Sequence, residues 1–317
     1  MRITWVSNHK EGLLAFQSVL NTKDEVNAFV TLTDTSFVKR SGGTRKFKKL
    51  CFEHNIPYYE VDTIKGDEAY EIIKTAKPDL LVVLGWSEIL PERLLLIPTI
   101  GTIGTHAAML PHNRGSAPIN WALIKNEKTT GNTMMWLNPE VDSGAIIDQI
   151  PFDIDIYDTC GTLYDKVAKT NRTMILHLLE ELNKGNKPVL NVKNETDEEL
   201  LPRRRPKDGL INWDSEGIDL YNFIRAVTKP YPGAFSFLNG QQVVIWDVAL
   251  LPFDSRKNSI KPGEIFDNTY SFSKSNNGFV VGTKTNALLI TRITIDGKEY
   301  YGKKINGLNL KGVFANE

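Results

Sequence analysis

Two side chains in the first half of the chain have the residue types that acid–base catalysis needs. His106 follows directly on a short apolar segment, so it is expected at the carboxyl edge of a sheet, where ligand sites of α/β proteins form. Asp142 stands in a Val-Asp-Ser-Gly sequence between two segments with the composition of strands. A carboxylate from a neighbouring loop can orient an imidazole and leave its second nitrogen for proton transfer. A histidine and an aspartate alone are also compatible with a structural role, so both interpretations stay open on these residues.

The elements that must position this pair alternate between strand and helix. Four strand-like segments are separated by helix-like segments, and the strands are expected at residues 3–6, 26–32, 58–61 and 80–84. The last of these is apolar at every position, which is typical of a central parallel strand. The pattern predicts an α/β fold with a Rossmann-like open, mostly parallel sheet over residues 1–190.

A second, smaller domain is expected after a polar segment. Asp158 and Thr159 can begin a long periodic helix, and the proline- and charge-rich residues 191–209 are predicted to be a linker. Beyond a helix at residues 218–227, short strands are separated by turn sequences such as Asn239-Gly240 and Asn276-Asn277-Gly278. We therefore expect a β-rich C-terminal domain over residues 210–317.

Composition excludes several classes of protein. The 317 residues carry 38 Lys and Arg and 38 Asp and Glu, so the chain lacks the global positive field of a dedicated nucleic-acid binder. Its two cysteines, Cys51 and Cys160, are too few for a disulfide scaffold or a cysteine-based zinc site. The longest apolar run is far shorter than a membrane span of roughly 20 residues. The first residues lack the apolar core of a secretion signal, so a cytoplasmic location is expected.

A set of short motifs resembles the signature of the folate-dependent formyltransferases. The motifs agree in order and spacing, and they are His106, Leu110-Pro111, Arg114-Gly115, Pro118, Thr130-Gly131-Asn132-Thr133 and Asp142-Ser143-Gly144. That family includes methionyl-tRNA formyltransferase, glycinamide ribonucleotide transformylase and the N-formyltransferases of nucleotide-linked amino sugars. The resemblance implies that 10-formyltetrahydrofolate is the co-substrate and that no metal is required.

The resemblance also implies roles for particular residues. His106 and Asp142 would be the catalytic residues, acting on an amine that attacks the formyl carbon through a tetrahedral intermediate. Two loops would hold the folate, and their residues are Gly85, Trp86, Ile89, Leu90, Asn138, Pro139, Glu140 and Val141. Trp86 is equally compatible with flanking the pteridine and with a place in the core.

The chain departs from the family pattern beside the histidine. The asparagine that the family places two residues before it is Gly104 here, and a serine that often follows two residues after it is Ala108. Removing a donor to a developing oxyanion typically costs about 3 kcal/mol of barrier. Another donor, for which Thr105 is one candidate, can substitute; alternatively the enzyme is slow, or the chain binds without catalysing. We favour substitution.

The acceptor amine is predicted from the second domain and from charge. The sequences around Arg203-Arg204-Arg205 and Tyr231 resemble both methionyl-tRNA and amino-sugar enzymes, and more closely the sugar enzymes of carbohydrate biosynthesis. A diphosphate needs one or two cations, whereas tRNA needs a basic groove. Arg203, Arg205 and Tyr231 are candidate contacts to the substrate. A solvated linker is the alternative for the arginine run. We expect a nucleotide-linked amino sugar as substrate.

Two further expectations concern partners. The cluster of Lys39, Arg40 and the basic residues at 45–49 keeps tRNA as the alternative acceptor. Related sugar enzymes often form dimers, so a homodimer is possible, although no sequence feature indicates one directly. A folate or sugar-nucleotide binding protein without catalysis is the third hypothesis, motivated by Gly104 and Ala108.

Overall fold

The structure is a computed structural model, and it describes residues 1–37, 43–192, 196–252, 259–267 and 277–315. The chain divides into two compact units. The first consists of residues 1–119, 128–154 and 162–202, and the second of residues 120–127, 155–161 and 203–317. Lys39, Arg40 and Asn276, which the sequence analysis singled out, lie outside the described residues.

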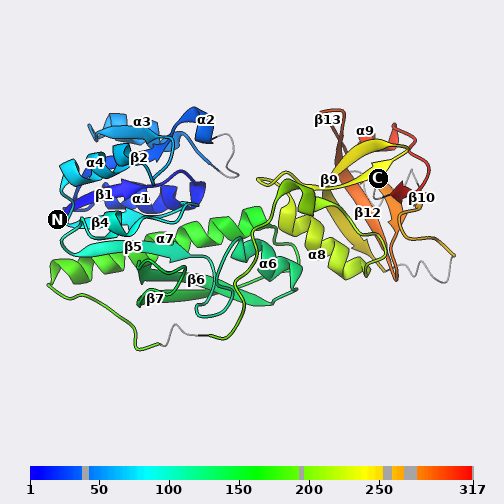
Figure 1. Ribbon diagram of the computed structural model, residues 1–317. Helices are drawn as coiled ribbons and strands as arrows, with labels where there is room; N and C mark the ends of the chain where they lie inside the picture. Colours follow the sequence, from blue (N-terminus) through cyan, green and yellow to red (C-terminus); the bar gives the residue numbers. More distant parts are fainter. Residues whose placement is uncertain (38–42, 193–195, 253–258, 268–276, 316–317) are drawn as a thin grey trace. The chain divides into compact units, whose positions relative to one another are not determined.

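The first unit is built on a seven-stranded sheet with the order β3-β2-β1-β4-β5-β6-β7 (Figure 1). The strands are β1 (Arg2–Val6), β2 (Glu25–Leu32), β3 (Tyr58–Val61), β4 (Leu80–Val83), β5 (Gly101–His106), β6 (Thr129–Trp136) and β7 (Ile146–Asp153). The pairs from β3 to β5 are parallel, whereas β6 runs antiparallel to both β5 and β7. The β5–β6 pairing sets His106 opposite Thr133.

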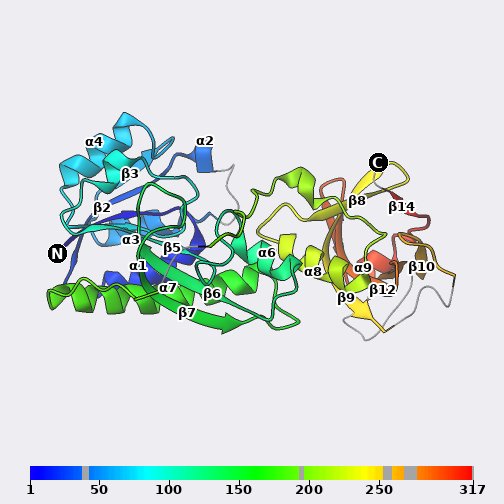
Figure 2. The same ribbon diagram turned by 60° about the horizontal axis from the view of Figure 1, so that its bottom comes forward.

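Helices cover both faces of this sheet (Figure 2). The helices of this part of the chain are η1 (Lys10–Gly12), α1 (Leu13–Val19), α2 (Asp34–Phe37), α3 (Lys46–Glu53), α4 (Asp67–Ala76), α5 (Glu92–Leu95), α6 (Pro118–Ile124) and α7 (Cys160–Asn183), and most of α6 belongs to the second unit. Apolar residues of α1, α3 and α7 share one core cluster, and those of α4 and α5 share another. Alternation along each strand divides its side chains between the clusters; Leu80 and Val82 face the first, and Leu81 and Val83 the second.

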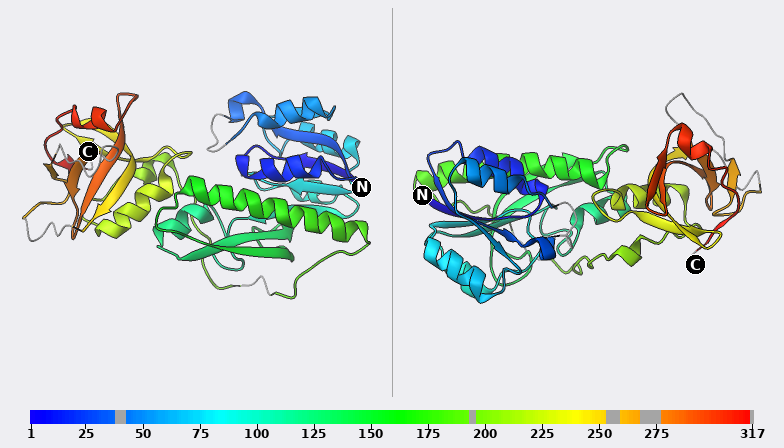
Figure 3. Two further views of the ribbon diagram at one scale, coloured as in Figure 1. Left: turned by 180° about the vertical axis from the view of Figure 1, so that it is seen from behind. Right: turned by 90° about the horizontal axis from the view of Figure 1, so that it is seen from above.

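The second unit contains an antiparallel sheet with the order β10-β11-β12-β9-β8-β14, and β13 pairs with β12. Figure 3 shows these C-terminal strands in yellow to red. Its elements are η2 (Pro206–Gly209), α8 (Gly217–Val227), β8 (Ala234–Leu238), β9 (Gln241–Leu251), β10 (Ile265–Asp267), β11 (Phe279–Gly282), β12 (Ala287–Ile295), β13 (Lys298–Tyr301), α9 (Lys303–Asn306) and β14 (Phe314–Ala315). The Asn239-Gly240 turn joins β8 to β9, and both residues have positive φ angles of 52° and 77°. A type I′ turn needs such angles at both central residues.

The predicted fold class is confirmed: a mostly parallel α/β sheet is followed by a smaller β-rich part. Among the helices that the structure describes, none has the length and apolar composition needed to cross a bilayer. The predicted domain limits remain a prediction.

Candidate active site

The structure brings His106 and Asp142 together at the end of β5. His106 is the last residue of this strand, and its Nδ1 lies 3.4 Å from Oδ2 of Asp142. The exposed fractions of the two side chains are 7% and 18%, so the pair is largely shielded from water. A charge interaction is stronger in such a place than at an exposed surface.

Local backbone geometry fixes the position of Asp142. This residue lies in the loop between β6 and β7 with a φ of +52°, a left-handed conformation that aspartate tolerates better than most residues. Its Oδ2 accepts a hydrogen bond of 2.9 Å from the backbone N–H of Gly115. The carboxylate therefore joins the loop after β6 to the turn that follows β5.

Both ring nitrogens of His106 face oxygen atoms. Nε2 lies 2.7 Å from the backbone carbonyl oxygen of Asn113, which can only accept a hydrogen bond, while Nδ1 faces the Asp142 carboxylate. For Nε2 to exchange a proton with a substrate, its contact with Asn113 must break.

Thr133 fastens the segment that follows His106. Its hydroxyl donates to the carbonyl oxygen of Ala108 at 2.7 Å and accepts from the backbone N–H of Leu110 at 3.1 Å. The side-chain amide of Gln149 donates to that hydroxyl at 2.9 Å and to the carbonyl oxygen of Leu110 at 2.8 Å. Because this hydroxyl is fully buried and has three hydrogen-bond partners, it holds the backbone of residues 108–110 in one position.

Arg114 connects the same turn to the loop of Asp142. Its guanidinium donates to the carbonyl oxygen of Val141 at 2.6 Å, one residue before the carboxylate. Its buried Nε has no hydrogen-bond partner among the residues that the structure describes. Thr133 and Arg114 belong to the motifs that carried the resemblance, but nothing in the sequence indicated which contacts they make. Gln149 belongs to no motif, so the sequence did not single it out.

The family's asparagine is Gly104 in this chain, and the side chain of Leu137 fills the space beside that glycine. A Cβ built on Gly104 would lie 2.8 Å from Cδ2 of Leu137, so this leucine packs directly on the glycine. Thr105 pairs with Met134, a residue of the core cluster under α1 and α7, and alternation puts it on the face opposite Gly104 and His106. This placement disfavours Thr105 as the substituting donor.

The first predicted folate loop follows β4. Gly85 has a φ of +68°, and its carbonyl oxygen accepts hydrogen bonds of 3.2 Å from the backbone N–H groups of Asn8 and His9. Trp86 packs against the cluster under α4 and α5, yet its buried indole N–H has no acceptor in the described part of the chain. Ile89 is exposed and Leu90 is buried.

The second predicted folate loop, residues 138–141, is exposed except at its end. Asn138 accepts a hydrogen bond of 2.9 Å from the hydroxyl of Ser143, which closes the loop. Pro139 and Glu140 are exposed, while the carbonyl oxygen of Val141 is held by Arg114. The loop is thus tied at both ends to residues beside Asp142.

The predicted acceptor contacts lie in the second unit. Arg203 and Arg205 are exposed, and the backbone N–H of Arg205 donates to Asp208 at 2.6 Å. Arg204 lies with its guanidinium carbon 5.2 Å from the centroid of the Trp121 ring, and burial lowers its pKa. Tyr231 is partly exposed and lies just after a cis Lys229–Pro230 bond.

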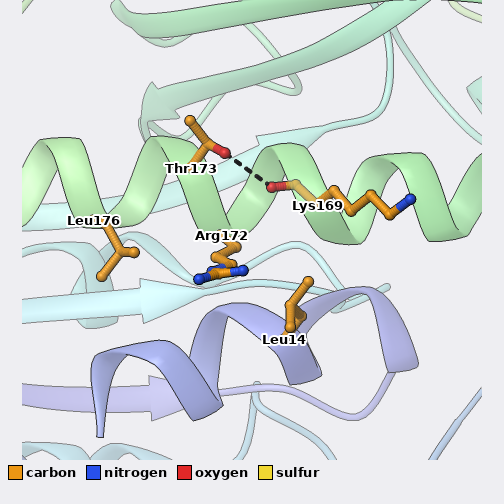
Figure 4. Close-up of a pocket in the computed structure, with 5 residues that line it drawn as sticks. All are labelled: Leu14, Lys169, Arg172, Thr173 and Leu176. Atoms are coloured by element: carbon orange, nitrogen blue, oxygen red, sulfur yellow. Dashed lines mark hydrogen bonds between the residues drawn. The ribbon is translucent and has the colours of Figure 1, made fainter. Parts of the chain in front are cut away.

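A shallow pocket of about 370 Å³ contains none of the predicted site residues (Figure 4). It lies between α1 and α7 and is lined by Leu14, Lys169, Arg172, Thr173 and Leu176. Within the described residues, no group of three or more His, Cys, Asp or Glu side chains is placed to hold a metal ion.

Comparisons with known proteins identify the family of the chain. A family model described as "Formyl transferase" matches residues 14–179, and one described as "Formyl transferase, C-terminal domain" matches residues 204–307. The chain is 32% identical over 306 residues to a methionyl-tRNA formyltransferase of Bacillus velezensis, covering 94% of this chain and 91% of that protein.

The chain is also similar to part of a longer protein and to a solved structure of about its own length. The bifunctional polymyxin resistance protein ArnA of Wigglesworthia glossinidia brevipalpis is 32% identical over 269 residues, which are 84% of this chain but only 40% of ArnA. The crystal structure of WlaRD, a sugar 3N-formyl transferase in the presence of dTDP and 5-N-formyl-THF, superposes with a TM-score of 0.60 at 17% identity. It covers 94% of this chain and 98% of WlaRD, and at this identity it shows the fold alone.

Proposed function

Since the chain belongs to the formyl transferase family and is a folate-dependent formyltransferase, we propose that it formylates the primary amine of a nucleotide-linked amino sugar, with His106 and Asp142 as its acid–base pair. The observation that supports the catalytic pair is the 3.4 Å approach of Nδ1 to Oδ2 at the end of β5. We also propose a catalytic domain over residues 1–190, a linker over 191–209 and a C-terminal domain over 210–317.

In this proposal 10-formyltetrahydrofolate supplies the formyl group. The loop of Gly85, Trp86, Ile89 and Leu90 and the loop of residues 138–141 hold it, at the positions that the resemblance to the family implies. The amine nitrogen forms a bond to the formyl carbon, and the bond from that carbon to the folate nitrogen breaks. His106 takes the proton that the amine loses and returns a proton to the leaving nitrogen, while Asp142 stabilises the charged ring.

The state of the basic residues at 45–49 favours a sugar nucleotide over tRNA. Arg45 donates to Asp34 and to the carbonyl oxygen of Leu32, Lys48 lies 3.2 Å from Glu60, and Lys49 lies 3.6 Å from Glu53. Arg45, Lys48 and Lys49 thus each have a carboxylate partner in the described structure, whereas a tRNA site needs cations that are available to several phosphates. The second candidate acceptor, initiator methionyl-tRNA, is favoured by the named relatives, several of which are methionyl-tRNA formyltransferases.

One experiment separates the candidate functions. The protein is incubated with 10-formyltetrahydrofolate and either amino-sugar nucleotides or initiator methionyl-tRNA, and formylated products are quantified by mass spectrometry. Formylated sugar supports the proposal, and formylated tRNA supports the second candidate. Tight folate binding without turnover of any acceptor supports a binding protein, the reading that Gly104 motivates. His106→Ala is expected to lower turnover by about 100-fold or more and to leave folate binding intact.

A further inference from the structure

A short segment well beyond α7 lies along the turn that contacts His106. The backbone N–H of Leu201 donates to the carbonyl oxygen of Arg114 at 2.7 Å, and the backbone N–H of Ser116 donates to the carbonyl oxygen of Leu201 at 3.0 Å. These two bonds form a parallel bridge between Gly115 and Leu201. Leu201 is buried, so the bridge is protected from competing water.

The bridge requires a glycine on the catalytic turn. Gly115 has a φ of +109°, and a Cβ at this position would lie 2.6 Å from both the nitrogen and the oxygen of Leu201. Backbone atoms cannot move away as a flexible side chain can. Only glycine therefore permits this close approach.

A carboxylate of the same segment holds the start of the turn. Oε1 of Glu198 lies 2.6 Å from Nδ1 of His112, and Oε2 accepts from the backbone N–H of Asn113 at 3.4 Å. Both side chains of this ion pair are more than 40% exposed, so it contributes little to stability. The backbone bridge at Leu201 is the stronger of the two attachments.

The turn so attached supplies two backbone groups that contact the proposed catalytic pair. The carbonyl oxygen of Asn113 lies 2.7 Å from Nε2 of His106, and the N–H of Gly115 donates to Asp142. The segment contacts Asn113, Arg114, Gly115 and Ser116, so it fixes the backbone from which those groups project.

We propose that residues 198–201 act as a strap that positions the imidazole of His106 through the turn at residues 112–116, with Leu201 as the main positioning residue. The inference rests on the proposed function in one respect, that His106 is catalytic. The segment was expected to be linker. Instead of only connecting two parts of the chain, it completes the support of the site.

The test compares two prolines placed in the same connecting segment. Leu201→Pro removes the N–H that donates to Arg114, whereas the matched control Val192→Pro alters an exposed residue whose N–H makes no hydrogen bond in the described structure. Turnover, the KM for 10-formyltetrahydrofolate and the ¹⁵N resonance of His106 Nε2 are measured, with circular dichroism to confirm folding. His106→Ala identifies the resonance by its loss.

We expect Leu201→Pro to lower kcat about tenfold, to leave the KM for folate within about twofold, and to shift the Nε2 resonance, because that nitrogen loses a fixed acceptor. Val192→Pro should match the wild type in all three. A folded Leu201→Pro protein with wild-type kcat and an unshifted resonance would overturn the strap.

Two controls keep the outcome decisive. If Leu201→Pro does not fold, Leu201→Ala keeps the N–H and removes the buried side chain, and a smaller shift of the same resonance is expected; an unchanged resonance contradicts the proposal. If His106→Ala retains full turnover, the proposed function fails, while the resonance still reports whether the strap positions the ring.

Discussion

At the scale of single residues, the carboxylate of Asp142 is placed to act on the imidazole of His106. An acceptor oxygen lies beside each ring nitrogen, one from a carboxylate and one from a backbone carbonyl. In the proposed reaction the carboxylate stabilises the ring after it has accepted a proton from the amine. The negative charge of Asp142, rather than its size, should therefore matter most.

Asp142→Asn tests this expectation because it keeps the shape of the side chain and removes its charge. We expect kcat to fall about 100-fold or more, with folate affinity little changed, since the imidazolium loses its counter-charge. Steady-state kinetics and folate titration measure the two quantities. Asp148→Asn is the matched control, since Asp148 lies 3.7 Å from Nδ1 of the exposed His177 and belongs to no proposed site. Equal losses in the two variants would refute a specific role of Asp142.

Gly104 and Leu137 provide a second test at this scale. Gly104→Asn should destabilise the protein by about 1–3 kcal/mol, because its Cβ would lie 2.8 Å from the leucine and the packed site must rearrange. Adding Leu137→Ala makes room, so the two substitutions together should cost less than the sum of each alone. Urea unfolding of the four proteins of the cycle measures this coupling. Strictly additive losses would show that the two positions do not compete for space.

At the scale of elements, the sequence predicted the strands and helices that have a hydrophobic periodicity or turn residues at their ends. The expected strand at residues 58–61 is β3, the expected helix at 218–227 lies within α8, and the apolar run at 80–84 contains the central strand β4. These segments have a hydrophobic period or turn residues of their own. The short helices α2, α5 and α9 have only four residues each and show no such period, so local sequence could not predict them.

The contacts that hold the segment after His106 and the turn at residues 112–116 join residues far apart in the sequence. For that reason the sequence did not predict them. Gln149 reaches Leu110 from β7, and Leu201 pairs with a turn more than 80 residues earlier in the sequence. Neither residue has a type or a neighbour that indicates such a contact. The pairing of His106 with Asp142, by comparison, was anticipated because both residues follow or precede recognisable strands.

Thr133→Val tests the attachment between β6 and the segment after β5. Valine has the same shape, so the variant removes three hydrogen bonds without leaving a cavity and should lower the free energy of unfolding by about 1–3 kcal/mol. The turnover number should fall as well, because the segment leads into the turn beside His106. Chemical denaturation and kinetics provide the readouts. Thr173→Val is the control, since that exposed hydroxyl donates to the carbonyl oxygen of Lys169 in its own helix. Similar losses of unfolding free energy and turnover in the two variants would contradict the interpretation.

At the scale of the whole molecule, His9 links folding to pH. It follows β1, accepts a hydrogen bond from the backbone N–H of Glu11 at 3.4 Å, and packs edge-on against Tyr164. Burial lowers the pKa of its imidazole below the ordinary value of 6.5, and the neighbouring Glu11 only partly offsets this. The folded state thus prefers the neutral ring, and in the window between the two pKa values the unfolded chain binds more protons.

It follows that stability contributed by the neutral His9 is present above pH 6.5 and is lost as the pH falls below it. The loss is at most about 1.4 kcal/mol per pH unit for one proton. In His9→Asn an amide oxygen can still accept from Glu11 while nothing titrates, so the fall in unfolding free energy between pH 7.5 and 5.5 should be smaller than in the wild type. Denaturant unfolding at both pH values measures it. His54→Asn, at an exposed position, is the control, and an unchanged pH dependence in His9→Asn would disprove the assignment.

The association state of the whole molecule remains a prediction. A homodimer is expected from the resemblance to sugar enzymes, and sedimentation velocity over a range of protein concentrations decides between one copy and two. The substrate assay does not depend on that outcome.

The leucine that covers Gly104 also bears on selective inhibition. Where the family pattern provides a carboxamide, this protein places the methyl groups of Leu137. A folate antagonist that gains affinity by accepting a hydrogen bond from that amide should bind this enzyme poorly. An antagonist with a small chloro or methyl substituent at the same point should show the opposite preference. Antimetabolites could then be made to distinguish this chain from relatives that retain the amide.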